Sequence, residues 1–162
     1  MAGLGLAISV AGALGFRFNL TESLPTGVYR VTSASPTRGS IVQVCLRRRA
    51  AEFARRRGYL GPGKCPRGVR PLGKVVLAIG GDVVRFELEG IRVNGEVIAN
   101  SRTAVRDRHG RPVAHHPWGV YRLRFGELWL FSDHRHAYDA RYFGPVHQAR
   151  VVAVLQPWWT RR

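Results

Sequence analysis

Apolar and polar positions alternate along most of the chain from residue 27 onward, and this pattern predicts a protein built mainly of β-strands. The clearest run opens at Gly73 and continues through Lys74 into five apolar residues that end at Ile79. Such a run indicates a strand that is buried on both faces. The expected strands are 27–33, 40–46, 73–79, 83–88, 91–93, 96–99, 120–125, 127–132 and 149–155.

One segment departs from this pattern and predicts a helix, Arg47–Tyr59. Its apolar residues Ala50, Phe53 and Ala54 fall on one face, and arginines surround them. A Gly- and Pro-rich loop follows at 61–73. We therefore expect a short helical insertion at about 47–66 within the β-rich chain.

The first sixteen residues are apolar and uncharged, and they allow three interpretations. As a helix they would span roughly 24 Å, slightly less than the ~30 Å hydrocarbon core of a bilayer. A cleaved signal peptide would carry a basic N-terminal region, which this segment lacks, and a buried core segment is the third possibility. We favour a transmembrane anchor over residues 1–18, followed by one domain over residues 19–162.

Composition supports a single globular domain with an unusual charge. The chain has 162 residues, 45% hydrophobic content and a formal net charge of +16. Nucleic acid and anionic lipid surfaces are the obvious partners for such a charge. No zinc-finger spacing, recognition-helix pattern or aromatic RNA-binding motif accompanies the arginines, which disfavours nucleic acid.

Two residues suggest catalytic chemistry. Only two of the 26 basic residues are lysines, Lys64 and Lys74. Burial in its apolar strand would lower the pKa of Lys74, and a neutral lysine can serve as general base for a serine hydroxyl. Ser23 is a candidate nucleophile because Pro25 and nearby turn residues stiffen its backbone. The alternatives are a strand-end lysine that reaches back to solvent and an ordinary loop serine.

Four short segments, in order, resemble the boxes of the type I signal peptidases, and most closely the TraF-type peptidases of conjugative transfer. The pattern Ser-x-Pro-x-Gly-x-Tyr at 23–29 resembles the nucleophile box, and 73–78 with Gly81-Asp82 resembles the lysine box. Residues 93–96 resemble the hairpin that follows, and 138–145 resemble the C-terminal acidic box. Together these segments cover most of the chain from residue 19 to residue 146.

The resemblance implies a role for each matching residue. Ser23 would be the nucleophile and Lys74 its base. Thr21 would assist the backbone N–H of Ser23 in stabilising the oxyanion. Asp139 matches the family's essential aspartate, acting through Arg141 or by orienting Lys74, although a simple loop ion pair with Arg141 is the alternative. No metal or other cofactor is expected.

The resemblance also implies a disulfide. TraF-type relatives carry two cysteines around a matching insertion, which here would be Cys45 and Cys65. A disulfide closing this loop of about twenty residues would contribute roughly 3 kcal/mol. Two free thiols are the alternative, and the spacing does not match a CxxC metal site.

The fold implied is a signal-peptidase-like coiled β-sheet or partial barrel. The activity implied is a membrane-bound serine endopeptidase of the bacterial inner membrane, with its catalytic domain in the periplasm. Its partners would be membrane lipids and a pilin-like precursor with a signal peptide, bound as an added strand. In the TraF branch the product can be cyclised, and the sequence leaves hydrolysis and cyclisation both open.

Rival functions remain from the sequence alone. A general signal peptidase or a self-cleaving Ser-Lys protease would use the same two residues. A basic, membrane-attached structural component of a transfer apparatus would use neither. A Ser-His-Asp site with His134 or His136, or a metal site made by His115, His116 and His134, receives less support because the histidines lie in polar loops.

Overall fold

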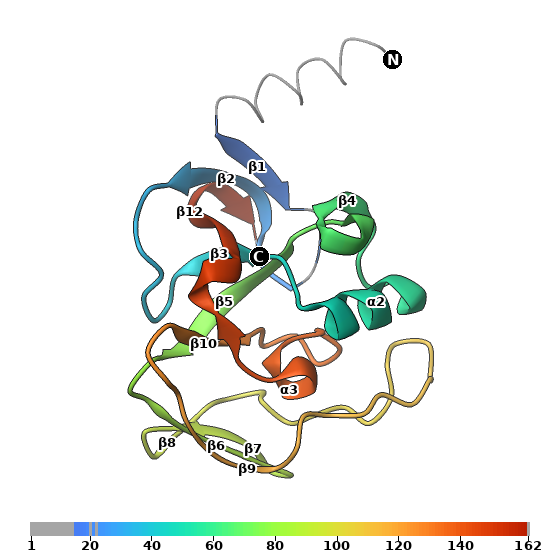
Figure 1. The fold of residues 1–162 in the computed structure, drawn as a ribbon, viewed down its shortest axis with the longest axis vertical. Coiled ribbons are helices and arrows are strands. Elements are labelled where there is room, and N and C mark those ends of the chain that lie inside the picture. Colours follow the sequence, from blue (N-terminus) through green and yellow to red (C-terminus); the bar gives the residue numbers. More distant parts are fainter. Residues whose placement is uncertain (1–14, 20, 22, 162) are drawn as a thin grey trace.

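The computed structural model describes residues 15–19, 21 and 23–161, and most of this part of the chain is β-structure (Figure 1). The strands are β1 (Phe16–Asn19), β2 (Thr26–Thr32), β3 (Ile41–Val44), β4 (Pro62–Cys65), β5 (Leu72–Ile79), β6 (Val83–Glu87), β7 (Gly90–Val93), β8 (Glu96–Val97), β9 (Gly119–Arg122), β10 (Glu127–Phe131), β11 (Val146–His147) and β12 (Val151–Arg161). The helices are α2 (Arg48–Arg57) and α3 (Ala140–Phe143), with 3-10 turns at Pro66–Gly68 and Gln148–Arg150. The mainly β fold class is confirmed.

Two antiparallel sheets organise the described residues. The larger sheet has seven strands in the order β1-β2-β12-β3-β5-β10-β11, and the smaller has four in the order β8-β7-β6-β9. Figure 1 shows the smaller sheet below the larger one, at the end remote from β1. Strand β12 comes last in the chain yet lies between β2 and β3, so the C-terminal strand joins the N-terminal hairpin to the rest of the sheet.

Strand β5 lies between β3 and β10, near the middle of the larger sheet, and positions Lys74 opposite Val42. One face of β5 is buried, and the residues of its other face are half-buried. The prediction of burial on both faces is therefore only half right, because the second face remains partly open to solvent.

Strand β12 is longer than the sequence indicated. It pairs with β2 as far as Arg161, beyond the expected end at residue 155. Pro157 caused the error, because a proline has no N–H to donate and usually ends a central strand. Here the register shifts between Pro157 and Trp159, and this irregularity accommodates the proline.

The predicted transmembrane anchor over residues 1–18 extends too far at its C-terminal end. Phe16–Asn19 forms β1, which pairs with β2, so the last residues assigned to an anchor belong to the larger sheet. The rest of the predicted anchor, residues 1–14, lies outside the described residues. Within the described part, no helix has the length and apolar character needed to cross a bilayer.

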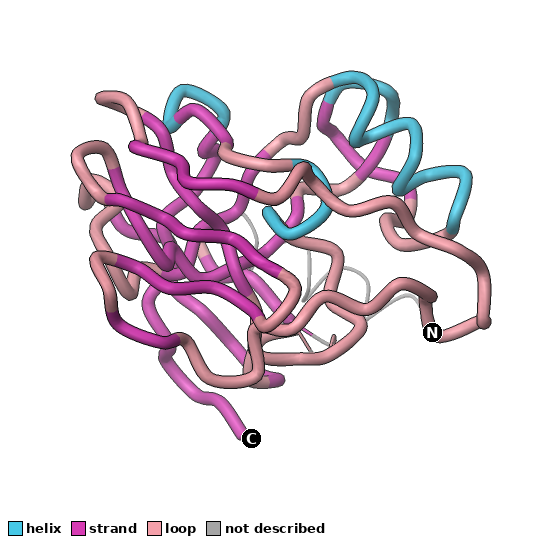
Figure 2. Tube along the Cα trace, turned by 90° about the horizontal axis from the view of Figure 1, so that it is seen from below, coloured by secondary structure: helices cyan, strands magenta, loops and turns pink. Residues whose placement is uncertain are grey.

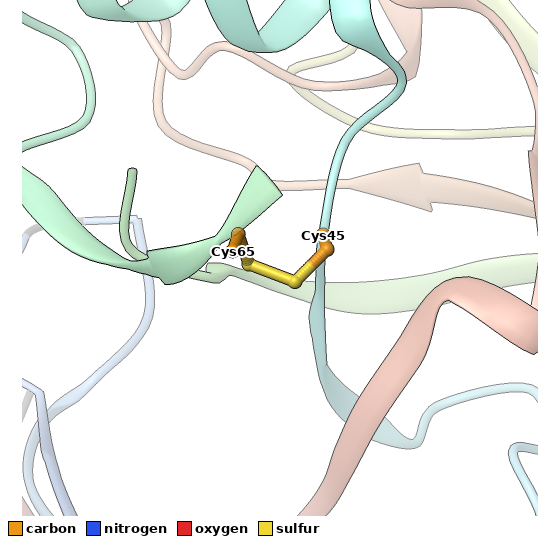
Figure 3. Close-up of a disulfide and its surroundings, with 2 residues drawn as sticks. All are labelled: Cys45 and Cys65. Carbon is orange, nitrogen blue, oxygen red and sulfur yellow. A yellow bond between two sulfur atoms is a disulfide. The ribbon is translucent and has the colours of Figure 1, made fainter. Parts of the chain in front are cut away.

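The predicted insertion contains α2, which ends at Gly58 in the left-handed conformation, with φ 72°. Ala51 and Ala54 bury one face of the helix in the core. Cys45 and Cys65 form a disulfide, with their Cα atoms 5.4 Å apart, which confirms the predicted pairing (Figure 3). The insertion is therefore covalently closed at its base.

Aromatic packing joins the insertion to the C-terminal segment. Tyr138 stacks on Phe53 of α2, with ring centroids 5.7 Å apart, and contacts Tyr59 at 5.3 Å. Tyr138 also contacts Tyr142 and Phe143. Figure 2 shows α2 to one side of the strands, and the long loop between β8 and β9 extends toward the same side.

Candidate active site

The turn that carries Ser23 is held by the side chain of Asn19. The Asn19 amide nitrogen donates to the carbonyl oxygens of Thr21 at 2.9 Å, Leu24 at 3.0 Å and Pro25 at 3.1 Å. The buried Tyr29 hydroxyl also donates to the Pro25 carbonyl, at 2.5 Å. Asparagine commonly replaces backbone partners in this way, and here it fixes a turn between β1 and β2.

The hydroxyls of Ser23 and Thr21 lie side by side. Their oxygens are 3.3 Å apart, and the Thr21 hydroxyl donates to the Asn19 side-chain oxygen at 2.7 Å. Thr21 is thus adjacent to the candidate nucleophile, and its role at the oxyanion stays a prediction. Its proton is directed toward Asn19 in this structure, so donation to an oxyanion would require the hydroxyl to rotate.

Lys74 is buried, with only 1% of its surface exposed. Burial lowers its pKa from 10.5 to about 8; the Asp139 carboxylate opposes this change, and the Arg141 guanidinium adds to it. Compared with an ordinary lysine, the neutral amine is roughly 300-fold more populated at pH 7. The sequence-based expectation of a buried lysine with a lowered pKa is confirmed.

Ser23 and Lys74 line one cleft of about 460 Å³. The serine turn packs directly onto β5, because a Cβ at Gly73 would lie 3.0 Å from the Cδ1 of Leu24. No hydrogen bond joins the Ser23 hydroxyl to the Lys74 amine among the described residues. Catalytic hydrogen bonds are often long without substrate and tighten when substrate binds.

Asp139 and Arg141, whose charges act on Lys74, form a completely buried ion pair, with both side chains 0% exposed. Asp139 Oδ2 accepts from Arg141 at 2.7 Å, and Oδ1 accepts from the Arg141 Nε at 2.9 Å. The remaining Arg141 donors go to the backbone carbonyls of Arg102, Ser132 and His134. The pair is therefore a core element that ties together three segments. The ion pair with Arg141 that the sequence suggested as the alternative is present, but it is completely buried and not an ordinary loop contact.

Ser132 connects this pair to the candidate nucleophile. Its backbone N–H donates to Asp139 at 3.1 Å, and its hydroxyl donates to the carbonyl oxygen of Ser23 at 2.9 Å. Sequence reasoning missed both Ser132 and Asn19. The only available signal was their position: Asn19 precedes the Thr-x-Ser turn, and Ser132 ends a strand just before the acidic box.

The contacts found among the described residues assemble neither of the rival histidine sites. His134 and His136 line the cleft, but the described hydrogen bonds to the Asp139 carboxylate come from Arg141 and Ser132. His115 stacks on Trp118, with ring centroids 3.9 Å apart. Among the residues that the structure describes, no three potential ligands converge on a point where a metal could bind.

Comparison with known proteins identifies the family. The family model for the signal peptidases, peptidase S26, matches residues 4–159. The chain belongs to the signal peptidase family. This confirms the resemblance seen in the four sequence segments, and it means that the chain belongs to a family of serine peptidases whose members are typically membrane-associated.

Curated relatives of this chain are named as plasmid or conjugal transfer proteins. A plasmid transfer protein TraF from Escherichia coli is 35% identical over 161 residues, which cover 97% of this chain and 90% of the relative. A conjugal transfer protein TraF from Agrobacterium fabrum is 36% identical over 165 residues, covering 99% and 92%. The crystal structure of a signal peptidase I from Enterococcus faecalis aligns with 77% of this chain and 100% of its own, at 19% identity and a TM-score of 0.45.

Proposed function

We propose that this signal peptidase is a membrane-bound serine endopeptidase that cleaves leader peptides with Ser23 as nucleophile and Lys74 as general base. One observation carries the proposal. A buried lysine with a pKa of about 8 lies in the same cleft as a serine whose turn packs against the lysine's own strand. Such a lysine can take a serine proton near neutral pH without a histidine.

In the first half of the proposed reaction, the Ser23 oxygen attacks the scissile carbonyl carbon while the Lys74 amine takes the hydroxyl proton. The resulting oxyanion would accept hydrogen bonds from the Ser23 N–H and, after rotation, from the Thr21 hydroxyl. Lys74 then passes its proton to the leaving amine, and the peptide C–N bond breaks. Ser23 is left as an acyl ester.

In the second half, neutral Lys74 accepts a proton from an attacking water. As the ester bond to Ser23 breaks, Lys74 returns that proton to the Ser23 oxygen, which restores the hydroxyl and the neutral amine. Asp139 and Arg141 take no proton in this scheme. They hydrogen-bond the backbone N–H and carbonyl of Ser132. The Ser132 side-chain hydroxyl in turn donates to the Ser23 carbonyl and so fixes the main chain of the nucleophile. Their role is to position the serine turn.

For the substrate, we propose an exported pilin-like precursor of conjugative transfer, processed at the periplasmic face of the inner membrane. Two features support this choice: the TraF names of the relatives and the cysteine-bridged insertion beside the cleft. If the acyl-enzyme is attacked by the N-terminal amine of the same precursor instead of water, the product is a cyclic peptide. The two products differ by the mass of one water.

The test uses membranes that contain the full chain and peptides with an Ala-x-Ala site, the small-residue pattern of signal-peptide cleavage. Ser23→Ala and Lys74→Ala should each abolish cleavage. The chain offers matched controls in the exposed Ser35 and in Lys64, its only other lysine, and Ser35→Ala and Lys64→Ala should cleave normally. Cleavage that persists in either active-site variant would refute the Ser-Lys assignment.

The substrate proposal has its own test. The signal peptidase should be co-expressed with a pilin precursor from the same transfer system, and the product weighed by mass spectrometry. A shortened product supports processing, and a mass lower by one water shows cyclisation. An unprocessed precursor, beside normal cleavage of the Ala-x-Ala peptide, would contradict the pilin assignment and leave the peptidase assignment standing.

A further inference from the structure

Two arginines in the wall of the cleft have no acidic partner among the residues that the structure describes. Arg70 and Arg108 line the same cleft as Ser23, and both are exposed. The ion pairs found among residues 15–19, 21 and 23–161 involve other arginines, namely Arg38, Arg57, Arg67, Arg85, Arg111 and Arg141. The charge of these two guanidinium groups is therefore not neutralised by a neighbouring carboxylate in the described structure.

The one carboxylate among the described lining residues is already fully used. Asp107 accepts hydrogen bonds from Tyr59 at 2.7 Å and from the Arg111 side chain at 2.8 Å, and Arg57 lies 3.5 Å away. Burial alone would raise the pKa of Asp107, but these hydrogen bonds hold it well below its ordinary value. Asp107 fastens its loop to the insertion and is not available to Arg108.

Both arginines are attached to fixed backbone. The Arg70 N–H donates to the Gly61 carbonyl at 2.9 Å, and its guanidinium lies so close to Gly61 that a Cβ there would be 3.2 Å from Nε. Arg108 sits in a loop where Asp107 accepts from the N–H groups of His109 and Arg111 at 2.9 and 3.0 Å. The Arg108 Nε also contacts His109, at 3.3 Å.

We propose that Arg70 and Arg108 form a subsite for a carboxylate of the peptide substrate. Guanidinium groups match a carboxylate in shape and charge, and two guanidinium groups whose charge is not neutralised attract an anion into the cleft. The carboxylate belongs to an acidic side chain near the scissile bond or to a free C-terminus. Ser23 lines the same cleft, so a peptide held by these arginines is placed in the cleft that contains the nucleophile. A lipid headgroup has no need of a binding site in that cleft, and we therefore favour the peptide.

This inference rests on the proposed function for its substrate, so binding is measured apart from catalysis. The probes are ten-residue peptides with an Ala-x-Ala core, labelled with a net-neutral rhodamine. In the first set, a single Glu is placed in turn at each position outside the core, and every such peptide has a counterpart with Gln at the same position. In the second set, a peptide with a free C-terminal carboxylate is compared with its C-terminal amide. The protein is the full chain carrying Ser23→Ala, and the readout is fluorescence anisotropy at 50 and 300 mM salt.

We expect at least one Glu peptide, or the free acid, to bind about five- to tenfold more tightly than its neutral counterpart at low salt. The preference should shrink at 300 mM salt, because partly exposed charges are screened. Adding Arg70→Gln and Arg108→Gln together should bring the ratio close to one. Arg92→Gln is the matched control, since Arg92 is exposed on β7, in the other sheet, and it should leave the preference unchanged.

Three results would overturn the subsite: equal binding of every Glu and Gln pair and of acid and amide, a preference that survives the double substitution, or an equal loss in Arg92→Gln. Reduced binding of the double variant to anionic lipid vesicles, with its peptide preference intact, would also overturn it in favour of lipid. Cleavage by the wild-type chain is measured separately. Carboxylate-selective binding without Ser23-dependent cleavage would refute the peptidase mechanism and keep the subsite.

Discussion

Replacing Asp139 with asparagine should destabilise the fold far more than an ordinary surface change. The substitution keeps the side-chain shape but leaves the Arg141 charge buried at 0% exposure without its counter-ion. Breaking a buried pair in this way typically costs about 3–5 kcal/mol. For a domain of this size, each kcal/mol lowers Tm by roughly 2–4 °C, so the expected fall in Tm is about 6–20 °C.

The assay is thermal unfolding followed by circular dichroism, with Asp133→Asn as the control. Asp133 is an exposed aspartate at the start of the same loop, and its substitution should stay within ~0.5 kcal/mol of wild type. A second variant, Asp139→Leu with Arg141→Met, removes both charges and should recover part of the loss. It should remain below wild type, because the carbonyls that Arg141 binds lose their donor.

Two outcomes would refute this reasoning. Asp139→Asn could unfold within about 1 kcal/mol of wild type, which would mean that the unpaired Arg141 charge is tolerated. Alternatively, the double variant could be no more stable than Asp139→Asn. In that case the loss would come from packing or hydrogen bonding and not from an unpaired charge.

Two further predictions concern the connections around the site. Ser132→Ala removes the hydrogen bond to the Ser23 carbonyl. We expect kcat to fall about tenfold or more at nearly constant KM, with only ~1 kcal/mol lost in the free energy of unfolding. An unchanged kcat would contradict the positioning role. Replacing Cys45 and Cys65 together with serine opens a loop with a sequence separation of 20 and should cost about 3 kcal/mol in urea unfolding. Reduced wild type should match that variant, and a loss below ~1 kcal/mol would contradict the loop-closure reasoning.

The sequence predicts much of this fold because local patterns determine it. Strands β5, β6 and β10 show the alternation or apolar runs that sheets require, and α2 ends at a glycine. The boundaries fail where tertiary pairing overrides local preference. Strand β12 continues through Pro157 because β2 supplies partners on both sides of it, and β1 forms because β2 lies beside it.

Some residues of the candidate site can also be identified from the sequence, and others cannot. Lys74 is identifiable from sequence because a lysine followed by five apolar residues must be buried or strand-terminal. Ser132 is not identifiable, because its importance depends on a contact with Ser23, 109 positions away, that no spacing encodes. The same is true of Arg70 and Arg108. The sequence does not distinguish these two residues from the other arginines, because only the fold brings both of them to one cleft.

The central claim is that neutral Lys74 activates Ser23, and the pH dependence of kcat/KM tests it most directly. Lys74 is inactive when protonated, so kcat/KM should rise with pH through a midpoint at about 8, the lowered pKa of this group. Lys74→Arg keeps a charge that cannot be removed and should be inactive at every pH. A midpoint near 6.5 that disappears in the His134→Gln, His136→Gln double variant, or activity in Lys74→Arg, would contradict the claim.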